Sequence, residues 1–190
     1  MKTNTQKPVG FFSPKITAVL CSLALMNCHG ARAAENHGQL SSSDYKFAVK
    51  ATKGGQAEVT LGQLATQKAA DPAVKKFAER LVEDHTKANQ QLNQILAQKG
   101  ATVPDETVTG SEQREMNRLQ KLSGAEFDKA YINHMLRDHK KDVKEFQNES
   151  DDAKDADIKS FATTTLPVLQ DHLKMAEDLD AAVKAEKGGM

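Results

Sequence analysis

The sequence predicts an all-α protein built around four long helices, and three observations support this fold class. Apolar residues recur at alternating steps of four and three residues over four long segments, which is the period of a helix with one buried face. No segment shows the two-residue alternation of a half-buried strand. The connections between the segments are short, long and short. Two antiparallel hairpins joined by a long crossover are therefore expected, as in a ferritin-like four-helix bundle.

The first hairpin is predicted from start and stop signals. Ser42 and Ser43 are candidate N-caps of the first helix, which is expected to end near Ala69. Asp71-Pro72 then combines a capping carboxylate with a proline at the first helical position, where its missing N–H is harmless. Gly100 can adopt the left-handed conformation that ends a helix. The turn between the two helices is short, so they are antiparallel neighbours.

The second hairpin follows a crossover. Residues 101–110 contain Pro104 with several Thr and Val residues and are expected to be extended, whereas residues 111–122 have the apolar spacing of a short helix. Ser123 and Glu126 match a capping box, which predicts the start of the third long helix.

One more turn and one more helix complete the bundle. The acidic, polar segment 148–155 is expected to be the turn. The apolar positions of the fourth helix run from Ile158 to Val183, and Gly188-Gly189 ends it.

The N-terminal segment has the features of an export signal. Three lysines precede the apolar run 16–26, and Ala31 and Ala33 follow at the positions that a signal peptidase reads. The run is about half as long as a membrane-spanning helix. We expect a cleaved signal peptide at 1–33, a polar tail at 34–42 and a helical domain at 43–187. The expected location is the periplasm, with secretion or outer-membrane association as the alternatives.

The mature chain is mildly acidic. Without residues 1–33 it has 22 basic and 26 acidic side chains, a net charge of −4 over 157 residues. This charge argues against a nucleic-acid-binding protein, which neutralises phosphates with basic residues. Cys21 and Cys28 are both lost on cleavage, so a thiol mechanism is excluded for the mature chain, and no remaining segment is expected to insert into a membrane. The sequence indicates neither a protein partner nor an oligomeric state.

Three of the five histidines left after cleavage share one pattern, Asp-His-x-Lys, and each lies on a different long helix. In each copy the apolar stripe passes through the histidine, and the aspartate lies about 100° around the helix. The helix without this pattern contributes a glutamate at a stripe position. Each long helix therefore directs one polar side chain inward, and these four are Glu58, His85, His139 and His172.

Two interpretations of this group are open. Three imidazoles and a carboxylate can bind zinc, copper or nickel, with Glu58, His85, His139 and His172 as the ligands. Residues beside them can then orient the ligands; the candidates are Asp84, Asp138, Asp171, Tyr131 and His134. In the other interpretation the protein is a ligand-free structural or stress-associated interaction module, in which the same four side chains form a hydrogen-bonded polar layer that sets helix register.

Two kinds of chemistry are disfavoured. A di-iron carboxylate site needs Glu-x-x-His on two helices, but Val82, Leu136 and Leu169 occupy the positions three residues before the histidines. Three histidines with a metal-bound water can support hydrolysis or redox chemistry, yet no nucleophile motif, cofactor loop or catalytic carboxylate pair accompanies them. A binding role is therefore the leading hypothesis, and an enzyme the weakest of the three.

Several stretches carry a family resemblance. They are the run GGQAEVTLGQLA at 54–65, Phe77-Ala78, Asp84-His85-Thr86, the segment 131–139, and Leu166-Pro167 with His172-Leu173. Together they resemble the bacterial family DUF4142, over roughly residues 42–184. The resemblance implies an exported ferritin-like bundle found mostly in Gram-negative bacteria and sometimes labelled an outer-membrane protein. It implies no established activity, so a role in metal handling or stress protection rests on the histidines.

Overall fold

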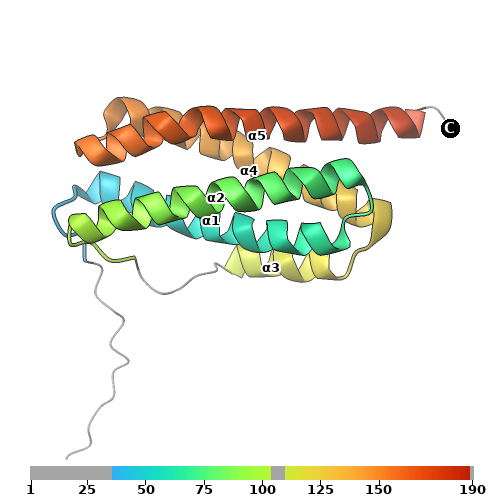
Figure 1. Ribbon diagram of the computed structural model, residues 1–190, viewed down its shortest axis with the longest axis horizontal. Helices are drawn as coiled ribbons and strands as arrows, with labels where there is room; N and C mark the ends of the chain where they lie inside the picture. The colour runs from blue at the N-terminus through green and yellow to red at the C-terminus, as the bar shows by residue number, and fades with distance from the viewer. Residues whose placement is uncertain (1–35, 104–109, 189–190) are drawn as a thin grey trace, which may run out of the picture. The chain divides into compact units, whose positions relative to one another are not determined.

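The computed structural model of this protein describes residues 36–103 and 110–188, with side chains as far as Ala185. These residues form five helices (Figure 1): α1 Ser42–Lys68, α2 Pro72–Gln98, α3 Gly110–Gln120, α4 Gly124–Asp152 and α5 Ala156–Gly188. α1 packs along α2, α4 packs along α5, and the hairpins meet where α2 contacts α5 and α1 contacts α4. The predicted all-α bundle is confirmed. The predicted signal peptide lies outside the described residues.

The start of α1 differs by one residue from the prediction. Ser41, rather than Ser42 or Ser43, is the N-cap, because its backbone is extended and its hydroxyl accepts a hydrogen bond from Asp44 N at 3.2 Å. Three consecutive serines offer the same chemistry, so only the backbone angles decide between them.

Of the other predicted helix-end signals, two are found in the structure and one is not. Asp71 caps α2 by accepting from Ala73 N at 2.7 Å, and Gly100 has the expected positive φ of 67°. The capping box at Ser123 does not form, since its side chain makes no capping hydrogen bond. Gly124 follows with φ 57°, which turns the chain away from the geometry that the box requires.

The second turn is shorter than predicted. α4 continues to Asp152, so the turn comprises residues 153–155 rather than 148–155. Gln147 stabilises this last part of α4 by donating to Ser150 and Asp151. A polar composition is compatible with an exposed helix end, and therefore it does not by itself predict a loop.

A buried carboxylate of each hairpin binds the turn of the other. Asp128 of α4 accepts hydrogen bonds from the backbone N–H groups of residues 70–71 at 3.1 and 2.8 Å. Asp44 of α1 accepts from those of residues 154–155 at 3.3 and 2.8 Å. Both carboxylates are nearly inaccessible, at 4% and 1% exposed. These reciprocal contacts fix how far one hairpin can slide along the other.

The described part of the predicted polar tail, from Asn36 onward, contacts the end of α2. Thr102 N donates to Asn36 O at 3.0 Å, and Gln39 N donates to Lys99 O at 2.9 Å. The pairing of Asn36 with Thr102 is an isolated β-bridge, and no longer strand occurs among the described residues. The segment before α1 is therefore held to the start of the crossover.

The core consists of two apolar clusters separated by polar residues. One cluster includes Leu92, Phe146 and Leu169, and the other includes Leu61, Leu81 and Met135. Along each long helix, the inward histidine or glutamate lies between residues of the two clusters. The polar layer is thus enclosed by hydrophobic packing on both sides.

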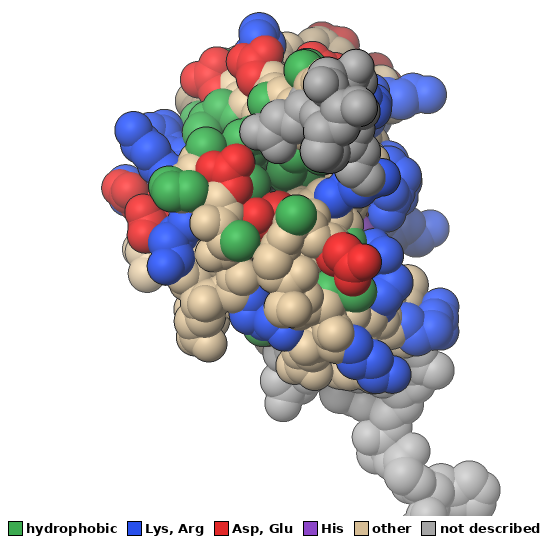
Figure 2. All heavy atoms as spheres, turned by 90° about the vertical axis from the view of Figure 1, so that its right-hand side faces the viewer, with side chains coloured by type: hydrophobic (Ala, Val, Ile, Leu, Met, Phe, Trp, Pro, Cys, Tyr) green, Lys and Arg blue, Asp and Glu red, His purple; other side chains and the backbone are tan. Residues whose placement is uncertain are grey.

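One end of the fold carries side chains of both charges. Figure 2 shows this end, where acidic and basic side chains are interspersed around a few apolar ones and almost no histidine is visible. Among the described helices, none is both long enough and apolar enough to cross a membrane.

Candidate metal centre

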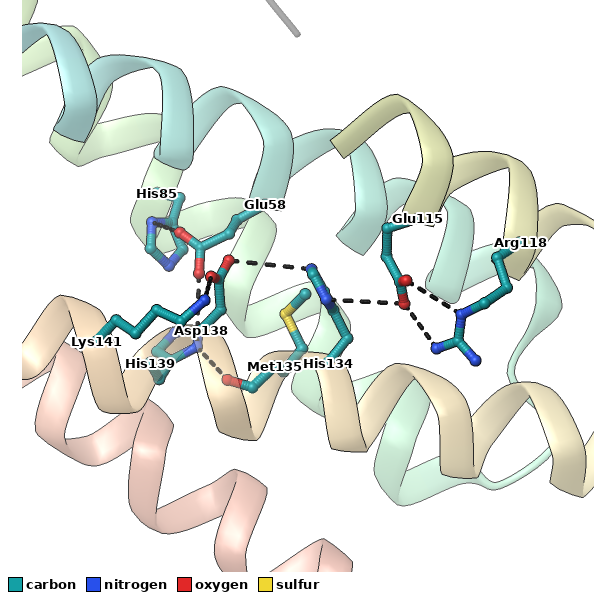
Figure 3. A network of polar contacts seen from close by, with 9 residues as sticks. All are labelled: Glu58, His85, Glu115, Arg118, His134, Met135, Asp138, His139 and Lys141. Atoms are coloured by element: carbon teal, nitrogen blue, oxygen red, sulfur yellow. Dashed lines mark hydrogen bonds and ion pairs between the residues drawn. The ribbon is translucent and has the colours of Figure 1, made fainter. Parts of the chain in front are cut away.

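The four inward side chains predicted from the sequence meet in the middle of the bundle. They come from four helices: Glu58 from α1, His85 from α2, His139 from α4 and His172 from α5. All are buried, with exposed fractions of 2%, 6%, 0% and 1% respectively. The glutamate and two of the histidines are seen together in Figure 3.

The three imidazole rings form a compact cluster. Their centroids are 5.3 to 5.6 Å apart, and one nitrogen from each ring lies within 4.8 Å of the other two. His139 Nε2 lies 3.3 Å from His172 Nδ1, within hydrogen-bonding distance. His85 Nε2 is buried and has no hydrogen-bond partner among the described residues. The rings therefore direct three nitrogens toward one small region.

The opposite nitrogen of each ring contacts an oxygen. The three contacts are His85 Nδ1 to Glu58 Oε2 at 3.1 Å, His139 Nδ1 to Met135 O at 3.0 Å, and His172 Nε2 to Asp84 Oδ2 at 3.0 Å. A neutral imidazole has one N–H, which these oxygens can accept. With the protons placed there, all three inward nitrogens are bare lone pairs.

Burial keeps the rings neutral. It lowers the pKa of His139 to about 3, and the neighbouring His172 ring contributes in the same direction. The pKa of His85 is well below its usual value for the same two reasons, burial and the adjacent rings. Burial also lowers the pKa of His172, although its hydrogen bond to Asp84 partly offsets this effect. At neutral pH the cluster therefore presents unprotonated nitrogens.

Asp84 is a charged acceptor for the cluster. Its burial alone would raise its pKa, but hydrogen bonds from Arg80 and His172 outweigh burial and lower the pKa. The carboxylate is 12% exposed and binds the Arg80 guanidinium on its outer side. It therefore links a solvent-exposed cation on α2 to an imidazole on α5.

The aspartates of the other two copies do not contact the cluster in this way. Asp138 Oδ2 lies 3.9 Å from His134 Nε2, and Asp138 Oδ1 lies 4.0 Å from Lys141 Nζ. Asp171 is exposed and acts on its neighbour His172 only through its charge. The repeated pattern thus places only Asp84 where the ring of a neighbouring helix can donate to it.

Tyr131 and His134 lie beside the cluster. Tyr131 is fully buried, its hydroxyl has no hydrogen-bond partner among the described residues, and burial together with the charge of Glu58 raises its pKa. His134 is partly buried, with Nδ1 3.7 Å from Glu115 Oε1 (Figure 3). Neither residue belongs to the group of three converging imidazoles.

Glu58 joins the histidines to a second polar group. Its Oε1 has no hydrogen bond among the described residues and lies 3.5 Å from His139 Nδ1. Oxygens of Glu58, Asp138 and Asp142 lie within 4.8 Å of one another. Burial raises the pKa of Glu58 well above its usual value, and the charges of the two aspartates add to this effect. Asp142 was not among the site residues predicted from the sequence, although its i, i+4 spacing from Asp138 places both aspartates on one face of the helix.

Two hollows reach the site. A cavity of about 30 Å³, large enough for one or two water molecules, is lined by Glu58, His85 and Asp142 among others. A pocket of about 200 Å³ between α2 and α5 is lined by Asp84, His85 and His172. The second hollow is lined by two of the three clustered imidazoles, His85 and His172.

Four long helices in two hairpins joined by a long crossover (Figure 1) place this protein in the ferritin-like class of all-α folds. Within that class, the family model DUF4142, a domain of unknown function, matches residues 29–179, so the chain belongs to this family. No curated protein matches the sequence.

Solved structures of low sequence identity share the fold. A DUF305 fragment from Deinococcus radiodurans has a TM-score of 0.67 at 14% identity, covering 75% of this chain and 98% of that one. A DUF305 protein from Streptomyces coelicolor, named as secreted, has a TM-score of 0.65 at 17% identity, covering 75% and 92%. CopM in its Cu(II)-bound form has a TM-score of 0.63 at 16% identity, covering 73% and 95%. At these identities the likeness concerns the fold alone.

Proposed function

We propose that this protein is a periplasmic metal-binding bundle that holds a divalent transition metal through His85, His139 and His172. The observation that carries the proposal is the convergence of three ring nitrogens, one from each buried histidine, while the opposite nitrogen of each ring contacts an oxygen. Bare lone pairs at 3.3 Å repel one another unless a cation or a proton lies between them. Because the rings are already neutral, a metal does not compete with protons for them at neutral pH.

The donor set fits this class of metal. Tetrahedral zinc–nitrogen bonds of about 2.0–2.1 Å place two ligand nitrogens about 3.4 Å apart, close to the separation between His139 and His172. Imidazole is a good ligand for zinc, copper and nickel alike. Oxygens that accept from the outer ring nitrogens are a regular feature of histidine metal sites, because they fix the ring and increase its basicity.

Glu58 has a different place in this proposal from the one the sequence indicated. Its Oε2 is bound to the outer nitrogen of His85, so we assign it the role of an acceptor like Asp84, rather than of a fourth ligand. The fourth position then remains for a water or a small ligand that arrives through the pocket between α2 and α5. Of the fold relatives, CopM is named in a Cu(II)-bound form, and copper is therefore the first metal to test.

A second candidate is a polar layer without any ligand. His139 can instead carry its proton on Nε2 and donate it to His172 Nδ1 across 3.3 Å. His139 Nδ1 would then need a donor, and a protonated Glu58 at 3.5 Å can supply one, in agreement with the raised pKa of that carboxyl. In this case the layer sets the register of the four helices and the function lies on the surface.

The two candidates are separated by titrating the mature protein, starting at Ala34 and free of tags, with Cu(II), zinc and nickel by calorimetry. The proposal expects one metal per chain, with binding lost in His172→Gln and kept in His134→Gln, which removes an imidazole outside the cluster. Equal binding by both variants and the wild type would refute the three-histidine site. Absence of binding in all three, with His172→Gln less stable, would support the polar layer.

A further inference from the structure

A second set of potential ligands shares Glu58 with the histidine cluster. One oxygen each from Glu58, Asp138 and Asp142 lies within 4.8 Å of the others. The two aspartates are one helical turn apart on α4, and Glu58 approaches them from α1. They line a groove of about 500 Å³, whereas Glu58 is 2% exposed. The set is therefore open to solvent at the aspartates and closed at the glutamate.

Four lysines line the groove, and among the described residues Lys141 is the only one of them that makes an ion pair with the set; the four are Lys46, Lys50, Lys53 and Lys141. Lys141 Nζ is 4.0 Å from Asp138, and its side chain is 71% exposed, so solvent screens this contact. Lys50 lines the same groove, but its ammonium binds Glu145. Asp142 has no hydrogen bond or ion pair within the described parts of the chain. Burial, with the charges of Asp138 and Glu145, raises the pKa of Asp142 to about 7.

One carboxylate oxygen of Glu58 independently indicates that a proton or a cation binds beside it. Its Oε1 is buried and accepts no hydrogen bond among the described residues. The nearby His139 Nδ1, at 3.5 Å, is already bound to Met135 O at 3.0 Å. Figure 3 shows the carboxylates of Glu58 and Asp138 beside each other, with the free oxygen turned away from His85. A buried carboxylate oxygen without a partner is costly unless a proton or a cation binds it.

We propose that Glu58, Asp138 and Asp142 form a second cation site, which takes a hard divalent cation of the Mn²⁺, Mg²⁺ and Ca²⁺ class. An all-oxygen set suits these ions and not copper. The half-buried aspartates leave one side of the cation to water, as such ions require. Glu58 serves both centres, with Oε2 on His85 and Oε1 on the cation. Only this sharing rests on the proposed function, because the oxygen site stands without the histidine metal.

The test is a Mn²⁺ titration of the metal-free mature protein at pH 7.5, followed by the loss of the free-ion signal in electron paramagnetic resonance. We expect one Mn²⁺ per chain. Asp142→Asn removes one ligand oxygen's charge and should weaken binding by about tenfold or more, at least as much as the loss of an outer-shell partner. Asp152→Asn, an exposed acid at the end of the same helix, is the matched control and should bind as the wild type does.

A further variant separates this site from the histidine centre. His172→Gln should keep the Mn²⁺ site while losing Cu(II) or zinc, and Asp142→Asn should do the reverse. Mn²⁺ binding that is equal in Asp142→Asn and wild type, or absent up to about 1 mM, where the weakest protein sites bind, would overturn the proposal. Helical circular dichroism of Asp142→Asn must match the wild type. We expect this because the substitution removes a half-buried charge that makes no hydrogen bond or ion pair among the described residues.

Discussion

Substitution of His139 by glutamine tests whether the cluster is buried and neutral. His139 is 0% exposed, and burial with the neighbouring ring lowers its pKa from 6.5 to about 3. A histidine whose folded-state pKa is depressed binds fewer protons in the folded than in the unfolded chain below pH 6.5. The free energy of unfolding is therefore not reduced by this titration above pH 6.5, and it is progressively reduced as the pH falls toward 3.

The size of the effect follows from these two pKa values. At pH 8 the unfolded histidine is almost uncharged, so the titration contributes nothing. At pH 5 the unfolded chain is favoured by about 2 kcal/mol through this residue alone. Glutamine cannot titrate, so His139→Gln should lose about 2 kcal/mol less stability than the wild type between pH 8 and pH 5.

The comparison must be made as a difference, because other groups act in the opposite direction. Glu58 and Asp142 have raised pKa values in the folded chain, so they hold protons that the unfolded chain releases. Their contribution to stability rises as the pH falls through their folded-state pKa, and it is present in wild type and variant alike. The total pH profile of the wild type can therefore be shallow even though each histidine is strongly perturbed.

Urea unfolding of the metal-free protein, followed by circular dichroism in EDTA at pH 8 and pH 5, gives the required free energies. The substitution also changes the free energy of unfolding by an amount that does not depend on pH. This amount cancels when the values at pH 8 and pH 5 are subtracted. Lys140→Gln changes the neighbouring residue, which is exposed. Its free energy of unfolding should change between pH 8 and pH 5 by the same amount as that of the wild type. Parallel wild-type and His139→Gln profiles would falsify the reasoning, since they require a histidine that titrates as it does in water.

The remaining predictions concern the acceptor of His172 and the packing of α1. Asp84→Asn should weaken transition-metal binding by about 10- to 100-fold in a calorimetric titration, while Asp171→Asn, the equivalent but exposed aspartate, should leave it unchanged. Gly62→Ala should lower the free energy of unfolding by about 1–3 kcal/mol, because its Cβ would lie 2.7 Å from a methyl group of α2. Gly54→Ala, with nothing within 4 Å, should raise it by up to about 1 kcal/mol; a denaturation series in which both glycines respond alike would contradict this.

The helices and their connectivity follow from local sequence signals, namely the apolar period and the residues that begin and end a helix. Asp71-Pro72 and Gly100 define their helix ends as predicted, because an N-cap carboxylate and a left-handed glycine act through bonds to the nearest residues. Where several residues offer the same local chemistry, the outcome depends on backbone angles. Ser41 caps α1 in place of its two neighbours, and Ser123 makes no capping bond beside the left-handed Gly124.

The inward direction of Glu58 and the three histidines was also predictable, because it follows from the helical period of the apolar residues. The roles of the flanking residues were not. Asp84, Asp138 and Asp171 occupy identical places in their motifs, yet only Asp84 accepts from a cluster histidine. A residue 100° from the inward face points toward one neighbouring helix or toward solvent, according to how the hairpins dock.

The sequence by itself determined the all-α class, the two hairpins and the inward direction of Glu58 and the three histidines. Tertiary structure alone decided which ring nitrogen faces inward, that Asp142 joins Glu58, and that Asp44 and Asp128 bind the opposite turns. The helical period specifies in which direction a side chain points around its own helix and how far along the helix axis it lies. Both depend only on hydrogen bonds between residues close in the sequence. Contacts of about 3 Å between helices depend on the docking of two separately specified hairpins, which only the packed core supplies.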